Sequence, residues 1–66
     1  MIKVHLSRIM GERKLNMSQL ALQAGLSKNT VRSLYHETAQ GITWEVLEKL
    51  CKTLKCQPGD ILELVD

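Results

Sequence analysis

The sequence predicts a single small all-α domain, and three observations lead to this prediction. The same pattern of residues that starts a helix occurs three times along the chain. Only three residues separate the second predicted helix from the third. The chain has 66 residues and no linker, repeat or low-complexity segment, which is the length of one domain. We therefore expect residues 1–66 to fold as one helical domain.

The two ends of the chain carry short apolar segments. The apolar residues of positions 2–6 alternate with Lys3 and His5, and positions 62–65 are mostly apolar. Alternation with a period of two is typical of a strand. The sequence therefore allows a short two-stranded β pairing of the termini.

A first helix is predicted from residue 6 to about residue 14. Leu6, Ile9 and Met10 recur at three- and four-residue spacing, as along one face of a helix. Gly11 disfavours this helix by about 1 kcal/mol relative to alanine. We expect the helix to end before Asn16, where the pattern breaks.

Three hydroxyl residues predict helix starts near residues 19, 28 and 44. An apolar residue precedes each of them, and another follows four positions later: Met17-Ser18 with Leu22, Leu26-Ser27 with Val31, and Ile42-Thr43 with Leu47. The hydroxyl can accept a hydrogen bond from an unpaired N–H of the first turn, and the two apolar side chains can pack as a staple. A last short helix is expected from Pro58 to Leu62, because proline suits the first helical position.

Gly25, Leu26 and Ser27 join the second and third predicted helices. Gly25 stands where a helix commonly ends on a left-handed residue, and Ser27 can cap the next helix at once. Two helices that cross steeply after a tight turn form a helix-turn-helix unit, here at residues 18–35. In such a unit the second helix enters the major groove of DNA, while the first crosses the backbone.

The third predicted helix has an apolar face and a polar face. Val31 and Leu34 lie on the apolar face. The polar face carries the residues predicted to contact bases: Lys28, Asn29, Arg32 and Ser33. Arginine or lysine can donate to guanine O6 and N7, asparagine can pair with adenine, and serine suits either base. The alternative is an ordinary helical hairpin whose polar face is only solvated.

The charges are unevenly distributed along the chain. Residues 1–36 hold six bases and one acid, for a net +5, whereas residues 37–66 hold three bases and six acids, for a net −3. A basic half suits a polyanion, and an acidic half is repelled by one. Solvated charge without a function is the alternative.

Several classes of function are disfavoured. Cys51 and Cys56 lack the partners that a zinc site or a disulfide framework needs, so we expect Cys51 in the core, Cys56 in a turn, and both thiols reduced. No apolar stretch reaches the ~18 residues of a membrane span, and no signal peptide is evident, so a cytoplasmic protein is expected. We expect no enzyme, because the chain has no room for a catalytic pocket, and no cofactor, metal or small-molecule effector.

Five segments together form a more specific pattern: Ser18-Gln19-Leu20-Ala21, Ala24-Gly25-Leu26-Ser27, Thr30-Val31 through Leu34-Tyr35, Leu47-Glu48-Lys49-Leu50-Cys51, and Leu54-Lys55-Cys56-Gln57-Pro58-Gly59-Asp60-Ile61-Leu62. Over residues 6–62 the chain resembles the phage-repressor (Cro/repressor, XRE-like) helix-turn-helix family. The last segment is similar to that of small stand-alone members. The resemblance implies a compact five-helix fold and regulation of transcription through double-stranded DNA.

The resemblance also implies roles for individual residues. It places the four polar-face residues named above against bases, and it gives candidates for phosphate contact: Ser18, Gln19, Thr30, Arg13, Lys14 and Tyr35. The start of the second helix also suits a phosphate on physical grounds, because its first N–H groups are free. Relatives often carry Asn-Gly and basic residues after the recognition helix, whereas residues 36–41 here contain Glu37 and no base. We therefore expect weaker non-specific DNA affinity than in relatives with a basic loop.

These observations predict a sequence-specific transcriptional regulator, a repressor that occupies an operator as a homodimer. Two recognition helices then read half-sites ~34 Å apart. The predicted dimer surface consists of Trp44, Leu62, Leu64 and Val65. The alternative is a protein-interaction module, such as an antitoxin-like partner, in which the same exposed helix or the acidic half binds another protein.

Overall fold

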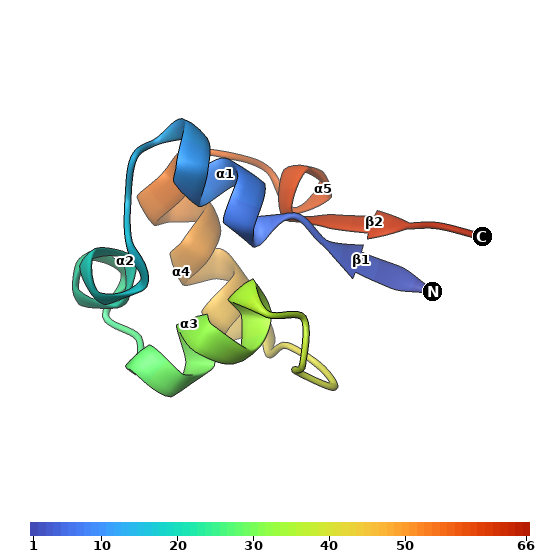
Figure 1. Cartoon of the computed structure of the whole chain (residues 1–66), viewed down its shortest axis with the longest axis horizontal. Coiled ribbons are helices and arrows are strands. Elements are labelled where there is room, and N and C mark those ends of the chain that lie inside the picture. The colour runs from blue at the N-terminus through green and yellow to red at the C-terminus, as the bar shows by residue number, and fades with distance from the viewer.

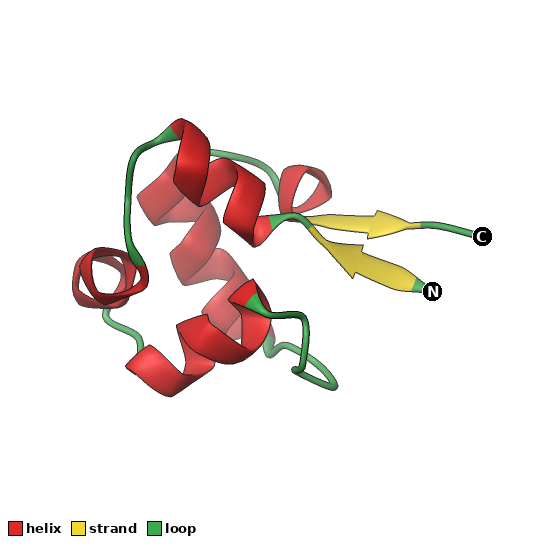
Figure 2. Cartoon of the chain, viewed as in Figure 1, coloured by secondary structure: helices red, strands yellow, loops and turns green.

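Five helices and two short strands make up the chain, and the computed structural model describes all of residues 1–66. In chain order they are β1 (Ile2–Val4), α1 (Leu6–Glu12), α2 (Met17–Ala24), α3 (Lys28–Tyr35), α4 (Trp44–Leu54), α5 (Pro58–Ile61) and β2 (Leu62–Leu64). Figure 1 shows α4 in the middle of the bundle, and Figure 2 shows that the two strands project from one end of it. The predicted five-helix fold is confirmed.

A single cluster of apolar side chains forms the core. Its twelve buried members are Leu6, Ile9, Met10, Leu20, Ala21, Ala24, Val31, Leu34, Leu47, Leu50, Leu54 and Ile61. Every helix contributes at least one of them, and α4 contributes three at helical spacing. Cys51, which was expected in the core, packs against it but is only half-buried.

The two termini pair as the alternation allowed. β1 and β2 are antiparallel, with Ile2 opposite Leu64 and Val4 opposite Leu62. The Nε2 of His5 lies 2.6 Å from a carboxylate oxygen of Glu63, so a side-chain contact ties the residue after β1 to β2. The sheet holds the beginning and the end of the chain side by side (Figure 1).

Two of the three predicted helix caps are confirmed. The Ser27 hydroxyl accepts the N–H of Thr30 at 3.1 Å, and the Thr43 hydroxyl accepts the N–H of Val46 at 3.1 Å. Both hydroxyl residues have an extended backbone, as a residue just before a helix requires. α3 and α4 therefore begin where the sequence places them.

The predicted cap and staple at the start of α2 are wrong. Asn16, not Ser18, caps this helix: the Asn16 Oδ1 accepts the N–H of Gln19 at 2.8 Å, and the Gln19 Oε1 accepts the N–H of Asn16 at 2.9 Å. This reciprocal pair is a capping box, and it starts the helix at Met17. Leu22 is 84% exposed, so it does not pack as the second member of a staple.

The first helix is also shorter than predicted. α1 ends at Glu12, and Lys14 has a left-handed backbone with φ 55°. A helix cannot continue through a left-handed residue, so the chain turns here toward α2.

We expect Asn16→Ala to lower the free energy of unfolding by about 1 kcal/mol, because it removes the cap of α2. For a domain of this size that loss corresponds to a fall in Tm of roughly 4–8 °C. Ser18→Ala is the matched control, since Ser18 is exposed and its hydroxyl has no hydrogen bond within the chain. Thermal unfolding followed by circular dichroism measures both. An equal loss in the two variants contradicts the assignment of the cap.

Candidate nucleic-acid interface

The turn between α2 and α3 has the geometry that the sequence predicts. Gly25 has a left-handed backbone with φ 69° and ψ 35°, and the N–H of Leu26 donates to the carbonyl of Ala21 at 2.9 Å. Glycine adopts this conformation without the strain that a Cβ atom brings. Ser27 then caps α3 immediately, so only three residues separate α3 from α2, and the two helices pack against each other.

Burial of one face of α3 turns the other face to solvent. Val31 and Leu34 are buried, whereas Lys28, Asn29 and Arg32 are exposed. None of these three polar side chains takes part in an ion pair, and the first turn of α3 contains no acidic residue. Their donors are therefore free, and they reach from the first residue of the helix to its last turn.

Ser33 and Thr30 are set apart from these three exposed side chains. Both are half-buried, and the Ser33 hydroxyl donates to the carbonyl of Thr30 at 3.0 Å. The Thr30 hydroxyl lies 2.8 Å from that of Ser27. The base contact of Ser33 and the phosphate contact of Thr30 stay predictions. The hydroxyl of each residue already has a hydrogen-bond partner inside the chain.

The start of α2 presents one free and one engaged polar side chain. Ser18 and Gln19 are both exposed, but the amide of Gln19 is held in the capping box. No acidic residue lies in the first turn of α2. The positive end of the helix dipole is therefore open to an anion.

The other predicted phosphate ligands lie in different surroundings. The Arg13 Nε donates to the carbonyl of Leu54 at 2.8 Å, which ties the end of α1 to the end of α4. Lys14 is exposed in the turn before α2. Tyr35 is half-buried at the end of α3, with its ring edge-on to that of His36 at a centroid distance of 5.1 Å. Of the three, only Lys14 is wholly free to meet a phosphate.

Sequence reasoning missed the role of Glu37, which follows the recognition helix. Its backbone is left-handed with φ 58°, and its Oε1 accepts the N–H of Val4 at 3.1 Å. The carboxylate is thus directed to β1. No local pattern signals this contact, because the two residues lie 33 positions apart.

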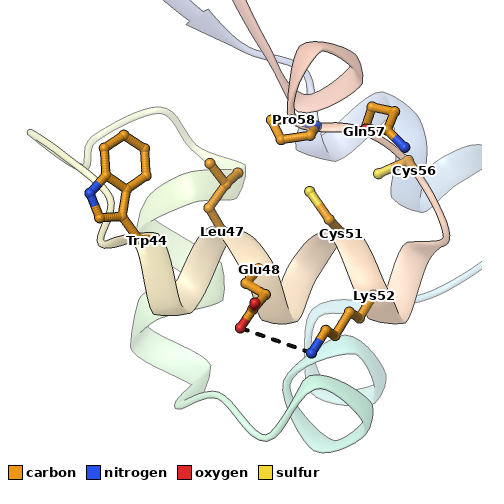
Figure 3. A pocket seen from close by; sticks show the side chains of 8 residues that line it. All are labelled: Trp44, Leu47, Glu48, Cys51, Lys52, Cys56, Gln57 and Pro58. Carbon is orange, nitrogen blue, oxygen red and sulfur yellow. Dashed lines mark ion pairs between the residues drawn. The ribbon is translucent and has the colours of Figure 1, made fainter.

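The predicted dimer residues divide between two parts of the surface. Leu62, Leu64 and Val65 lie in or next to β2, and Leu64 is 72% exposed. Trp44 begins α4 and is 85% exposed, at the rim of a groove along α4 and α5 (Figure 3). Trp44 and Leu64 are exposed, and Leu62 and Val65 are half-buried. Each of the four therefore has some surface that a partner could contact.

The structure contains neither a cluster of metal ligands nor a membrane-spanning helix. His, Cys, Asp and Glu side chains nowhere gather in the groups of three or more that could hold a metal ion. No helix has both the length and the apolar character needed to cross a bilayer.

Comparisons with known proteins agree with this arrangement. A family model described as the Cro/C1-type HTH DNA-binding domain matches residues 5–66. YozG of Bacillus subtilis (strain 168), described as an uncharacterised HTH-type transcriptional regulator, is 34% identical over 62 residues, which cover 94% of this chain and 74% of YozG. A crystal structure of a candidate DNA-binding protein from Bacteroides fragilis shares the fold, with a TM-score of 0.81, 22% identity, and coverage of 96% of this chain and 100% of that chain. The chain therefore belongs to the family of Cro/C1-type helix-turn-helix DNA-binding domains.

Proposed function

We propose that the protein is a sequence-specific transcriptional repressor that binds double-stranded DNA in the cytoplasm and occupies its operator as a homodimer. The observation that carries this proposal is the polar face of α3, where three unpaired side chains stand together. Family membership supports the same conclusion. YozG, described as a transcriptional regulator, is similar over nearly the whole chain.

The proposed interface divides into base contacts and phosphate contacts. Arg32 and Lys28 donate to guanine, and Asn29 pairs with adenine, because these side chains match the base edges in the major groove. Ser33 is a fourth, weaker base contact, since its hydroxyl is already engaged. The proposed phosphate contacts come from the turn after α1, the start of α2, and α3: Arg13, Lys14, Ser18, Gln19, Thr30 and Tyr35. Phosphate contacts fix the position of the protein on the duplex and carry no sequence information themselves.

The proposed dimer brings two recognition helices to half-sites about one DNA turn apart. Exposed Leu64 and Trp44, with Leu62 and Val65, supply apolar area for the contact between subunits. Most of the acidic residues lie in the same C-terminal half, which the dimer keeps away from the phosphates. A dimer placed across a promoter represses by occupancy alone.

Selection of bound duplexes from a randomised DNA pool, followed by sequencing, tests the proposed function. We expect enrichment of an inverted repeat whose half-sites lie about 10 base pairs apart, centre to centre. Affinity for the selected duplex should fall log-linearly with salt, because each phosphate contact releases about one counterion. A pool that shows no enrichment, or a single half-site without a repeat, contradicts specific dimeric binding.

Exposed apolar side chains favour a second candidate, a module that binds another protein as antitoxins do. Leu22 and Trp44 are 84% and 85% exposed, on α2 and α4. An apolar interface is nearly indifferent to salt, unlike a phosphate interface. Salt-independent binding of a protein partner, with no enrichment from the DNA pool, selects this candidate instead.

A further inference from the structure

The two cysteines of the chain meet at the end of α4. Lys55 has a left-handed backbone with φ 54° and ψ 52°, and the N–H of Cys56 donates to the carbonyl of Cys51 at 3.1 Å. This bond closes the helix end as in a Schellman motif, in which the first and sixth residues lie next to each other. Residues five apart in sequence are thus neighbours in space.

The side chains of the two cysteines face the same groove. Both residues are half-buried, and both line a groove of about 360 Å³ whose walls include Trp44, Leu47 and Pro58. Figure 3 shows both sulfur atoms between the end of α4 and the start of α5, open to the groove. A small molecule can therefore reach the pair.

Both cysteines pack against the edge of the core, and neither has an evident DNA-binding role. Neither residue belongs to the twelve buried core side chains, and no third ligand completes a metal site. Both lie on α4 or after it, outside the polar face of α3. We propose that Cys51 and Cys56 form a dithiol site that low-molecular-weight disulfides, such as oxidised glutathione, convert to an intramolecular disulfide.

The reaction proceeds by two thiol–disulfide exchanges. The thiolate of one cysteine attacks the small disulfide, forms a mixed disulfide and releases one small thiol. The thiolate of the other cysteine then attacks the protein sulfur of that mixed disulfide and releases the second small thiol. In total the two cysteines lose two protons and two electrons, which reduce the small disulfide to two thiols.

The surroundings of the thiols make the first exchange slow and the second fast. Burial raises the pKa of both thiols, and the carboxylate of Asp60 on α5 raises it further, whereas the charge of Arg13 lowers the pKa of Cys56. Glu48 and Lys52, which pair with each other at 3.9 Å, are the charged residues that line the groove. Arg13 and Asp60 line a second hollow that Cys56 also borders, together with Arg8, Glu12 and Lys55. Below these pKa values the thiolate fraction grows tenfold per pH unit, so the first step should accelerate by roughly tenfold between about pH 7 and pH 8. The second step joins two residues that the helix end already holds next to each other, so the mixed disulfide should not accumulate.

The cross-link ties the end of α4 to the residues that begin α5. Cys56 lies two positions before Pro58, the first residue of α5, and β2 follows α5 directly. Closing a short loop reduces the freedom of the unfolded chain, so the oxidised protein should melt roughly 5–15 °C above the reduced one. The disulfide thus fixes the C-terminal segment, α5 and β2, more firmly to the end of α4.

The experiment treats the whole folded chain with oxidised glutathione, blocks the remaining thiols by alkylation and weighs the products by mass spectrometry. We expect a monomer that has lost two hydrogens and has no alkylated cysteine, with the predicted acceleration at higher pH and the higher Tm. In Cys51→Ser and Cys56→Ser the reaction should stop at one glutathione adduct, because the second thiol is absent. Circular dichroism confirms that each variant folds before it is scored.

The same reaction in concentrated urea tests whether the fold, and not only the short distance in sequence, brings the two thiols together. The unfolded chain should pass through a visible glutathione adduct, whereas the folded chain should not. A persistent adduct on the folded wild-type protein overturns the proposal. Disulfide-linked dimers as the main product, or a Tm that does not rise on oxidation, overturn it equally.

Discussion

Leu50→Ala should leave most of the protein unfolded at 37 °C. Leu50 has no exposed surface and lies at the middle of α4, with Leu47 and Leu54 on the same buried face. Truncating a buried leucine costs about 2–5 kcal/mol, through lost burial and the cavity left behind. A core of this size supplies only about 3–5 kcal/mol, so the loss nearly equals the whole stability.

Leu22→Ala is the matched control for this experiment. It makes the same chemical change in a helix, at a side chain that is 84% exposed. We expect a change in the free energy of unfolding within about 0.5 kcal/mol. Urea unfolding followed by circular dichroism compares the two variants. If Leu50→Ala lost no more stability than Leu22→Ala, α4 would not form the centre of the core.

Arg32→Ala should weaken binding to the selected duplex by about 1–3 kcal/mol, which is roughly 5- to 150-fold. The guanidinium of Arg32 is exposed and outside every ion pair, so its loss removes a proposed contact to guanine and disturbs little else. Binding to random duplexes should change much less, and preference at the contacted base pair should relax. Asn29→Ala should behave in the same way at a neighbouring base pair.

Two controls separate base contact from charge. Arg8→Ala removes the same charge from α1, where Arg8 lines a hollow beside Lys55 and Asp60. This variant should change the affinity for selected and random duplexes by the same small amount. Lys14→Ala should weaken binding to all duplexes about equally and flatten the salt dependence, as expected for a phosphate contact. Titrations of both duplexes by fluorescence anisotropy at two salt concentrations measure these differences. Equal losses for Arg32→Ala on selected and random DNA would refute its role in base recognition.

Local interactions explain which features the sequence predicted correctly. A capping side chain and the N–H that it accepts are only three positions apart in sequence, so Ser27 and Thr43 revealed the starts of α3 and α4. The polar face of α3 follows from helical spacing within eight residues. Asn16 was missed because two capping residues, Asn16 and Ser18, compete there, and the apolar residues around Ser18 favoured the wrong one.

Contacts between distant residues explain what the sequence left open. The Arg13 guanidinium meets a carbonyl 41 residues away. Leu22 fits the apolar pattern but faces solvent, because the packing of α2 on α3 and α4 selects Leu20, Ala21 and Ala24 instead. Such outcomes depend on how whole helices pack, and no short pattern encodes them.

The contact between Glu37 and β1 has a consequence for how the protein behaves at high concentration. A two-stranded sheet has two open edges, and unpaired N–H groups on an edge invite strands of other molecules to add. On β1 the outward N–H of Val4 is already taken by Glu37, and a charged side chain stands at that edge. The addition of a strand from another molecule is therefore opposed at the Val4 end of β1.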